Sequence, residues 1–206
     1  MIRTFANRDG RFVFAGEDLA ALDAAVWVDL LRPTKDEETA LERVFGIDVP
    51  TREEMSEIEL SSRLYFEDGA HFMTAMMLSH TDADNVLLSP LSFVLVGERL
   101  VTVRYEEPRA IDTFIARCQK AGTYTADGLF AGLLEGLIER AGDVLERTGH
   151  ELDAISGEIF SIPSPKPKQH SPLALPEPKS KPRNFQSVLE QLGRKGDLLS
   201  KVRESL

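Results

Sequence analysis

Residues 91–105, LSFVLVGERLVTVRY, place the strongest constraint on how this chain can fold. They contain two short apolar runs rich in β-branched residues, separated by Gly97-Glu98-Arg99. Two such runs around a glycine-containing turn predict a β-hairpin. The apolar residues are successive instead of alternate, which is typical of strands that are covered on both faces. We therefore expect this hairpin in the centre of a sheet, with helices packed above and below it.

The remaining chain before residue 122 mixes further strands with helices. Residues 2–14 hold a second hairpin pattern around Asp9-Gly10, residues 64–78 a third, and residues 26–30 a single strand with Asp29 at its end. Thr34 and Thr51 each precede a Glu by three residues, which is the capping-box spacing of a helix start. These elements predict an α/β (α+β) fold in which helices sandwich a mixed, largely antiparallel central sheet.

The second part of the chain predicts a long helical arm. We expect an α/β/α domain over residues 1–122 and a long helix over residues 123–161, whose near-heptad apolar spacing slips at Thr148. Residues 162–183 are rich in proline and predict a linker. Residues 184–206 predict another amphipathic helix, which reaches the last residue without an end signal and so indicates a truncated chain.

Composition narrows the possible partners and compartments. A net charge of −10 argues against nucleic acid or anionic lipid as the main partner, because both require a basic surface. The single cysteine, Cys118, falls on the apolar side of a predicted helix, so we expect its side chain to be buried. One cysteine cannot form a disulfide within the chain, which fits a reducing cytoplasm. No apolar run approaches the ~18 residues of a membrane span, and the N-terminus does not resemble a signal peptide, so we expect this fragment to be soluble.

No pattern in the sequence indicates an enzyme. We find no Ser/His/Asp or Cys/His arrangement and no glycine-rich phosphate loop after a strand. His71, His80, His150 and His170 lack zinc-ligand spacing to one another or to Cys118, so we interpret them as scattered histidines without a metal. We therefore expect no catalytic residues and no organic cofactor.

The order of the predicted pieces resembles the cytoplasmic domain of CorA-type divalent-cation transporters, including the ZntB branch. The segments that carry this resemblance are residues 26–30, 36–47, 51–55, 63–68, 91–108, 129–160 and 192–199. The resemblance implies a funnel-shaped regulatory domain of a homopentameric transporter at the cytoplasmic face of the plasma membrane. It also implies that residues 184–206 begin a stalk helix that continues into membrane spans. Neither the spans nor the pore signature, a Gly-Met-Asn or related tripeptide, is in this sequence, so the chain alone could not conduct ions.

The resemblance further implies a regulatory Mg²⁺ site. Glu53 and Glu54 match the acidic pair at the subunit boundary of the family, and Glu135 or Glu139, on the long helix, matches a nearby second acidic position. In the family the neighbouring subunit adds a carboxylate from far down the stalk helix, at a position beyond Leu206. Mg²⁺ prefers oxygen ligands and keeps several waters, so clustered exposed carboxylates would suffice. The alternative is that Glu53 and Glu54 only stabilise a helix N-terminus, where negative charge opposes the macrodipole.

Two questions stay open at the level of sequence. The transported cation could be Mg²⁺, Co²⁺, Ni²⁺ or Zn²⁺, because the pore that selects it is absent. The chain could also be a soluble α/β scaffold that pairs through its long helix and has no transport role. A reading frame that continues past Leu206 into two apolar spans would support the transporter, whereas a stop codon there would support the scaffold.

Overall fold

The computed structural model describes residues 1–57, 59–81, 86–120, 122–160 and 185–205. Their strands form one seven-stranded sheet in the order β2-β1-β3-β7-β6-β5-β4. Only the β3–β7 pair is parallel, which confirms the prediction of a mixed, largely antiparallel sheet. The strands are β1 (Ile2–Arg8), β2 (Arg11–Gly16), β3 (Trp27–Leu31), β4 (Leu64–Glu67), β5 (Ala70–Ser79), β6 (Leu87–Val96) and β7 (Arg99–Arg104).

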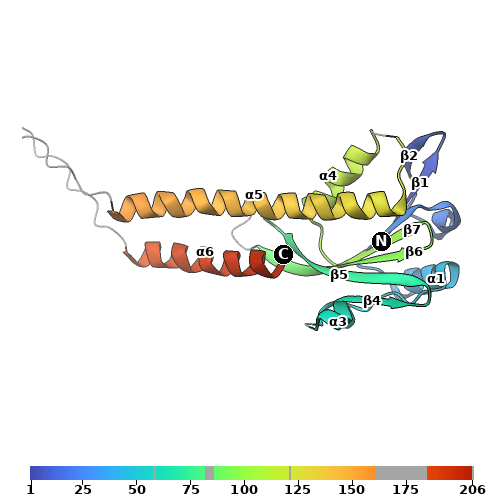
Figure 1. Cartoon of the computed structure of the whole chain (residues 1–206), viewed down its shortest axis with the longest axis horizontal. Coiled ribbons are helices and arrows are strands. Elements are labelled where there is room, and N and C mark those ends of the chain that lie inside the picture. Colours follow the sequence, from blue (N-terminus) through green and yellow to red (C-terminus); the bar gives the residue numbers. More distant parts are fainter. Residues whose placement is uncertain (58, 82–85, 121, 161–184, 206) are drawn as a thin grey trace, which may run out of the picture.

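Helices cover both faces of this sheet (Figure 1). Helices α1 and α2 pack on one face, whereas α4 and the first part of α5 pack on the other. The 3-10 helix η1 and the short helix α3 are additions that the sequence patterns did not predict. The helices are η1 (Leu19–Ala24), α1 (Lys35–Phe45), α2 (Arg52–Met55), α3 (Leu60–Arg63), α4 (Arg109–Cys118), α5 (Ala126–Phe160) and α6 (Phe185–Ser205).

The β6–β7 hairpin lies in the interior of the sheet, as its apolar runs predicted. Val94 pairs with Val101, and both side chains belong to the core beneath α1 and α2. Phe93 and Leu100 point the other way, into the core beneath α4 and α5. Each of these side chains is almost completely buried, and such burial stabilises a fold by about 1.5–3 kcal/mol per residue.

Both predicted capping boxes are present. The hydroxyl of Thr34 accepts a hydrogen bond from the backbone N–H of Glu37, and Thr51 does the same for Glu54. In each box the glutamate carboxylate accepts the backbone N–H of the threonine in return. Helix α1 ends at Gly46, whose φ of 67° is a left-handed conformation that glycine adopts without steric cost.

The helical arm consists of α5 and α6, which run antiparallel and extend together beyond the sheet (Figure 1). Ala141 and Val144 of α5 pack against Leu198 and Val202 of α6. At the slip in the heptad pattern, the buried Thr148 donates its hydroxyl to the carbonyl oxygen of Val144 at 2.7 Å, so the polar group is satisfied within the helix. The predicted linker, residues 162–183, lies outside the described residues.

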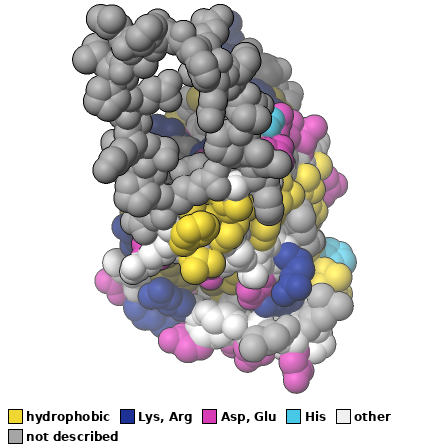
Figure 2. Space-filling view, turned by 90° about the vertical axis from the view of Figure 1, so that its left-hand side faces the viewer, with side chains coloured by type: hydrophobic (Ala, Val, Ile, Leu, Met, Phe, Trp, Pro, Cys, Tyr) yellow, Lys and Arg dark blue, Asp and Glu magenta, His cyan; other side chains and the backbone are white. Residues whose placement is uncertain are grey.

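Helix α6 is only partly covered by α5. Leu198 and Val202 are buried, but several large hydrophobic side chains of α6 remain more than a third exposed, namely Phe185, Leu189, Leu192 and Leu199. The view toward the C-terminal end of α5 and the N-terminal end of α6 shows hydrophobic side chains in the middle of that face, with charged side chains below and beside them (Figure 2).

Candidate functional site

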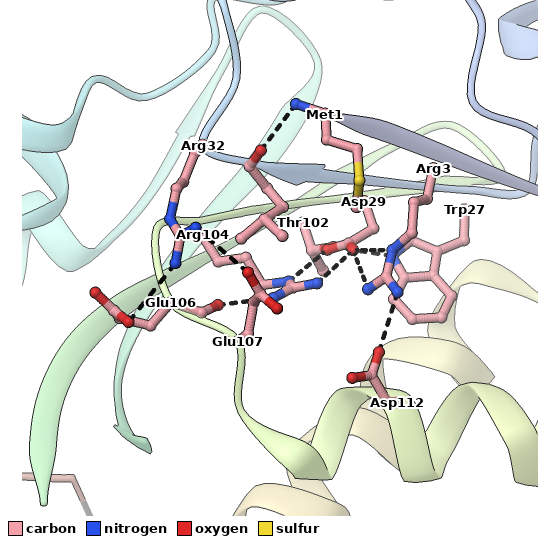
Figure 3. Close-up of polar contacts among 11 residues, drawn as sticks. Met1, Arg3, Trp27, Asp29, Arg32, Thr102, Arg104, Glu106, Glu107 and Asp112 are labelled. Carbon is pink, nitrogen blue, oxygen red and sulfur yellow. Dashed lines mark hydrogen bonds and ion pairs between the residues drawn. The ribbon is translucent and has the colours of Figure 1, made fainter. Parts of the chain in front are cut away.

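The most highly connected polar group in the described structure is the carboxylate of Asp29 in β3 (Figure 3). Its Oδ1 accepts hydrogen bonds from the Thr102 hydroxyl at 2.8 Å and from Arg104 Nε at 3.0 Å. Its Oδ2 accepts from Arg104 Nη2 at 2.9 Å. Asp29 and Arg104 are both almost inaccessible to solvent, so this pair is a buried bidentate ion pair.

A second guanidinium completes the site from the opposite neighbour strand. Arg3 of β1 donates from Nε at 3.0 Å and from Nη2 at 2.6 Å to Asp29 Oδ2. Its remaining Nη1 reaches Asp112 of α4 at 3.0 Å. The register explains the convergence, because Asp29 lies directly beside Arg3 in β1 and beside Thr102 in β7. The cluster therefore ties three strands and one helix together.

The electrostatics of the site favour the charged form of Asp29. Burial alone would raise the pKa of this carboxyl, but the guanidinium groups of Arg104 and then Arg3 outweigh burial and lower it. The two oxygens already accept five hydrogen bonds. No lone pair is left for a metal ion or a substrate, so the cluster stabilises the fold and does not perform chemistry.

Sequence reasoning missed this cluster. It placed Asp29 at the end of its strand, whereas the structure places it inside β3, with buried residues on both sides. The signal that could have indicated the cluster is an acidic residue within an otherwise apolar run, since a buried charge requires a partner. The identity of that partner is not encoded locally, because Arg104 is 75 residues away.

The predicted metal residues of α2 lie in its exposed first turn. The carboxylate of Glu54 accepts the backbone N–H of Thr51 at 2.8 Å and its hydroxyl at 2.9 Å, so this side chain caps the helix. Glu53 is exposed. Its negative charge, like that of Glu38 in α1, acts on the hydroxyl of Tyr105. Burial first, and then Glu38 and Glu53, raise the pKa of the Tyr105 hydroxyl, although Arg52 opposes them.

The predicted metal residues of α5 lie on the opposite side of the sheet. Glu135 lies 3.8 Å from the guanidinium of Arg117. Glu139 lines a groove between α4 and α5 together with Arg109, Arg117 and Arg140. A single chain thus does not bring Glu53 and Glu54 near Glu135 and Glu139. Within the described ranges, no three His, Cys, Asp or Glu side chains are grouped so that they could hold a metal ion.

The predicted burial of Cys118 is confirmed, and the described histidines lie at exposed positions apart from it. Cys118 is buried, and burial raises the pKa of its thiol. His71 packs on the ring of Phe66, and the Nε2 atom of His80 lies 3.4 Å from Glu106. His170 lies outside the described residues.

Comparison with known proteins identifies the family. A family model described as CorA-like Mg²⁺ transporter protein matches residues 23–175, which is more than half of the chain. The chain belongs to this family. The magnesium transport protein CorA of Haemophilus influenzae is 32% identical to the CorA-like chain over 165 residues, covering 78% of the chain and 52% of the relative. CorA of Wolinella succinogenes is 25% identical over 220 residues, covering 100% of the chain and 61% of the relative.

The CorA-like chain spans about half the length of the curated CorA relatives from Haemophilus influenzae and Pasteurella multocida. Its fold matches the soluble domain of CorA from Methanocaldococcus jannaschii with a TM-score of 0.62 and 12% identity, over 98% of the chain and 94% of that domain. The ZntB cytoplasmic domain from Vibrio parahaemolyticus gives a TM-score of 0.52 and 15% identity, over 74% of the chain and 64% of that domain. The family match and these structures confirm the predicted resemblance to the CorA family and to the fold of its soluble domains. None of the described helices combines the length and the apolar character needed to cross a membrane.

Proposed function

We propose that the CorA-like chain is the cytoplasmic, cation-sensing part of a homopentameric divalent-cation transporter, and that the sensed cation is Mg²⁺. The family membership and the curated relatives, which are magnesium transport proteins, support this role. The sensing residues in this proposal are Glu53 and Glu54 of one subunit together with Glu135 or Glu139 of its neighbour. The transported ion itself is Mg²⁺, with Co²⁺, Ni²⁺ and Zn²⁺ as the alternatives.

One observation carries the proposal: the two acidic pairs lie on opposite faces of the same sheet. Helix α2, with Glu53 and Glu54, packs on the face that includes Val94 and Val101. Helix α5, with Glu135 and Glu139, packs on the face that includes Phe93 and Leu100. A cation can bridge these pairs only between two copies of the chain. The binding of such a cation would therefore depend on how the subunits are arranged.

The mechanism would be electrostatic. Each chain carries a net charge of −10, so packed copies repel one another. Mg²⁺ bound between carboxylates at a subunit boundary removes part of this repulsion and favours the closely packed arrangement. When the cation concentration falls, Mg²⁺ dissociates, the carboxylates repel one another again and the subunits separate. The assembly would then respond to cytoplasmic Mg²⁺.

The proposal predicts that Mg²⁺ promotes self-association of the chain through α2. The test is sedimentation velocity of the wild type and of a double variant, Glu53→Gln with Glu54→Gln, across a Mg²⁺ titration. Glutamine is accepted at the third position of a capping box, so Glu54→Gln removes charge while α2 keeps its cap. The wild type is expected to associate at lower Mg²⁺ than the double variant.

The matched control removes two charges elsewhere, by Glu17→Gln with Glu98→Gln, both at exposed positions outside the helices. This control should follow the wild type, because its net charge equals that of the test variant but α2 is intact. A wild type that shows no response to Mg²⁺, or a test variant that matches the control, would reject the assignment. A reading frame that stops at Leu206 would instead favour the soluble scaffold.

A further inference from the structure

Strand β5 has an uncovered side over its second half. It pairs with β6 from Ala70 to Ser79, whereas on its other side β4 covers only Ala70 to Met73. Among the described residues, none pairs with β5 beyond Met73 on that side, and β5 continues past β4 toward the C-terminal end of α6 (Figure 1). Residues 74–78 are therefore called the open edge of β5.

The pairing with β6 shows which backbone groups face the open edge. Met76 lies opposite Pro90 of β6, and proline has no N–H to donate. Hydrogen-bonded and non-hydrogen-bonded pairs alternate in an antiparallel ladder, so Met76 and Pro90 form a non-hydrogen-bonded pair. The N–H and C=O groups of Met76 then point away from β6, as do those of Thr74 and Leu78, two residues to either side.

The turn between β4 and β5 gives the same orientation independently. Both residues of this turn, Asp68 and Gly69, have positive φ angles, which is typical of a two-residue hairpin turn. In such a turn the N–H of the fourth residue, Ala70, points to the C=O of the first, Glu67, so the backbone of Ala70 faces β4. The orientation repeats at every second residue, so Met76 faces the same side, past the end of β4.

An apolar cavity of about 240 Å³ lies along the open edge. Four successive residues of β5, from Ala75 to Leu78, line it. Successive side chains of a strand point to opposite faces, so a cavity that touches all four lies beside the strand and not on one face. Leu134, Leu137 and Ile138 of α5 form another wall. The volume is below the ~300–1,000 Å³ of small-molecule sites, so the cavity suits individual apolar side chains.

The open edge lacks the features that protect exposed strands. Native edge strands usually carry charged residues, a proline or a bulge, which prevent pairing with other chains. Residues 73–79, MTAMMLS, contain no charged residue and no proline. Their register with β6 continues without a shift, so no bulge bends this part of β5 away. An edge of this kind is suited to pairing with a further strand.

We propose that the open edge of β5 binds an extended peptide of a partner protein as an additional β-strand. The peptide backbone pairs with the free N–H and C=O groups of Thr74, Met76 and Leu78, and its apolar side chains on one face enter the cavity. The main-chain hydrogen bonds supply affinity, and the cavity selects apolar residues at alternate positions. The inference does not depend on cation transport or on the carboxylates of α2.

A single peptide fits the open edge better than a second copy of the chain. Helix α3, which directly precedes β4, packs against β5 at the Met73 end, and α6 packs against Leu78 at the other end. Pairing of two β5 edges would bring these helices of both copies together, and each copy carries a net charge of −10. One extended peptide needs only the ~4.8 Å spacing of a neighbouring strand.

The test is fluorescence anisotropy of a labelled heptapeptide of alternating valine and threonine, titrated with the chain in EDTA. Two further peptides carry backbone N-methyl groups, one at every valine and the other at every threonine. The N–H groups of alternate residues point to opposite edges of a strand. One methylated peptide is therefore expected to bind at least about tenfold more weakly, because it loses its hydrogen bonds to β5, while the other binds like the parent.

Protein variants test the two parts of the site separately. Ile138→Gln makes the cavity wall polar and is expected to weaken binding several-fold. Its matched control is Leu145→Gln, which changes another exposed apolar residue of α5 that is not on the cavity wall and should leave the affinity unchanged. Met76→Pro removes an N–H of the open edge without removing one from the β6 ladder, so it should abolish binding while circular dichroism shows a folded chain.

Loss of affinity with only one methylated peptide, and with Ile138→Gln but not Leu145→Gln, supports the site. The proposal is overturned if the wild type does not bind the parent peptide, or if the two methylated peptides bind equally. It is also overturned if the wild type self-associates in EDTA and Met76→Pro does not, as measured by sedimentation velocity, because a second copy would then occupy the open edge.

Discussion

The guanidinium of Arg104 grips the carboxylate of Asp29 through two parallel hydrogen bonds, Nε to Oδ1 at 3.0 Å and Nη2 to Oδ2 at 2.9 Å, in the interior of the sheet. Both side chains are at most 2% exposed. Desolvating an ion pair costs several kcal/mol per ion, so the pair is tolerated only because nearly every polar atom has a partner. Removing one partner should therefore destabilise the fold by more than the intact ion pair stabilises it.

Asp29→Asn is expected to destabilise the fold by about 3–5 kcal/mol, because it leaves the buried Arg104 without a counter-charge. Urea unfolding followed by circular dichroism measures this change. The control is Asp112→Asn, which removes the exposed partner of Arg3 and should cost less than about 1 kcal/mol. Equal losses in the two variants would show that burial of the Asp29 pair does not matter.

The contribution of Asp29 should depend on pH in a defined direction. The pKa of Asp29 is lowered in the folded state from its ordinary value of 3.8, so the unfolded chain takes up this proton first as the pH falls. The stabilisation is complete above that value and is lost as the pH drops below it toward the folded pKa. The stability difference between wild type and Asp29→Asn should therefore be constant at neutral pH and shrink below about pH 4. Unfolding curves at several pH values measure it, and a difference that grows on acidification would contradict the lowered pKa.

The hydroxyl of Thr102 both donates and accepts a hydrogen bond in this network. It donates to Asp29 at 2.8 Å and accepts from the indole N–H of Trp27 at 3.0 Å. Thr102→Val removes both bonds and should destabilise the fold by about 1–3 kcal/mol, since the buried indole N–H loses its acceptor. Thr102→Ser keeps the hydroxyl and should cost less. Trp27 is the only tryptophan, so its fluorescence follows unfolding directly in both variants.

Two glycines of α5 should respond oppositely to the same substitution. A Cβ on Gly132 would lie 2.5 Å from Cε2 of the buried Phe114 ring, so Gly132→Ala should cost about 1–3 kcal/mol through overpacking of α4 against α5. A Cβ on Gly142 would meet nothing within 4 Å, so Gly142→Ala should stabilise by about 0.5–1 kcal/mol. Thermal unfolding gives both values, and a shift of the same sign in the two variants would refute the packing argument.

Features that depend on neighbouring residues could be predicted from the sequence. The Asp9-Gly10 turn, the β6–β7 hairpin and the capping boxes at Thr34 and Thr51 all occur where the local patterns placed them. The predicted long helix over residues 123–161 corresponds to α5, which begins three residues later, at Ala126, and ends one residue earlier, at Phe160. These features are set by turn chemistry, periodicity and end caps, which act over a few residues.

The arrangement of these pieces depends on contacts that no local pattern encodes. The parallel pairing of β3 with β7 joins segments more than 70 residues apart, and the partners of Asp29 come from β1 and β7. The short helix η1 was missed because its Leu and Ala residues show no helical start pattern apart from Asp18. The metal role of Glu53 and Glu54 stays a prediction, since their position in the first turn of α2 is also explained by capping and the helix dipole.

The place of β7 between β3 and β6 has a consequence for biosynthesis. A ribosome releases β1–β3 and then β4–β6 as two separate antiparallel units, and the last strand to emerge is the one that joins them. Before that strand is made, the carboxylate of Asp29 cannot leave water, because its principal counter-ion has not been synthesised. The six residues of β7, Arg99–Arg104, join these two units into one sheet. A nascent chain halted before Arg99 is therefore expected to remain sensitive to protease.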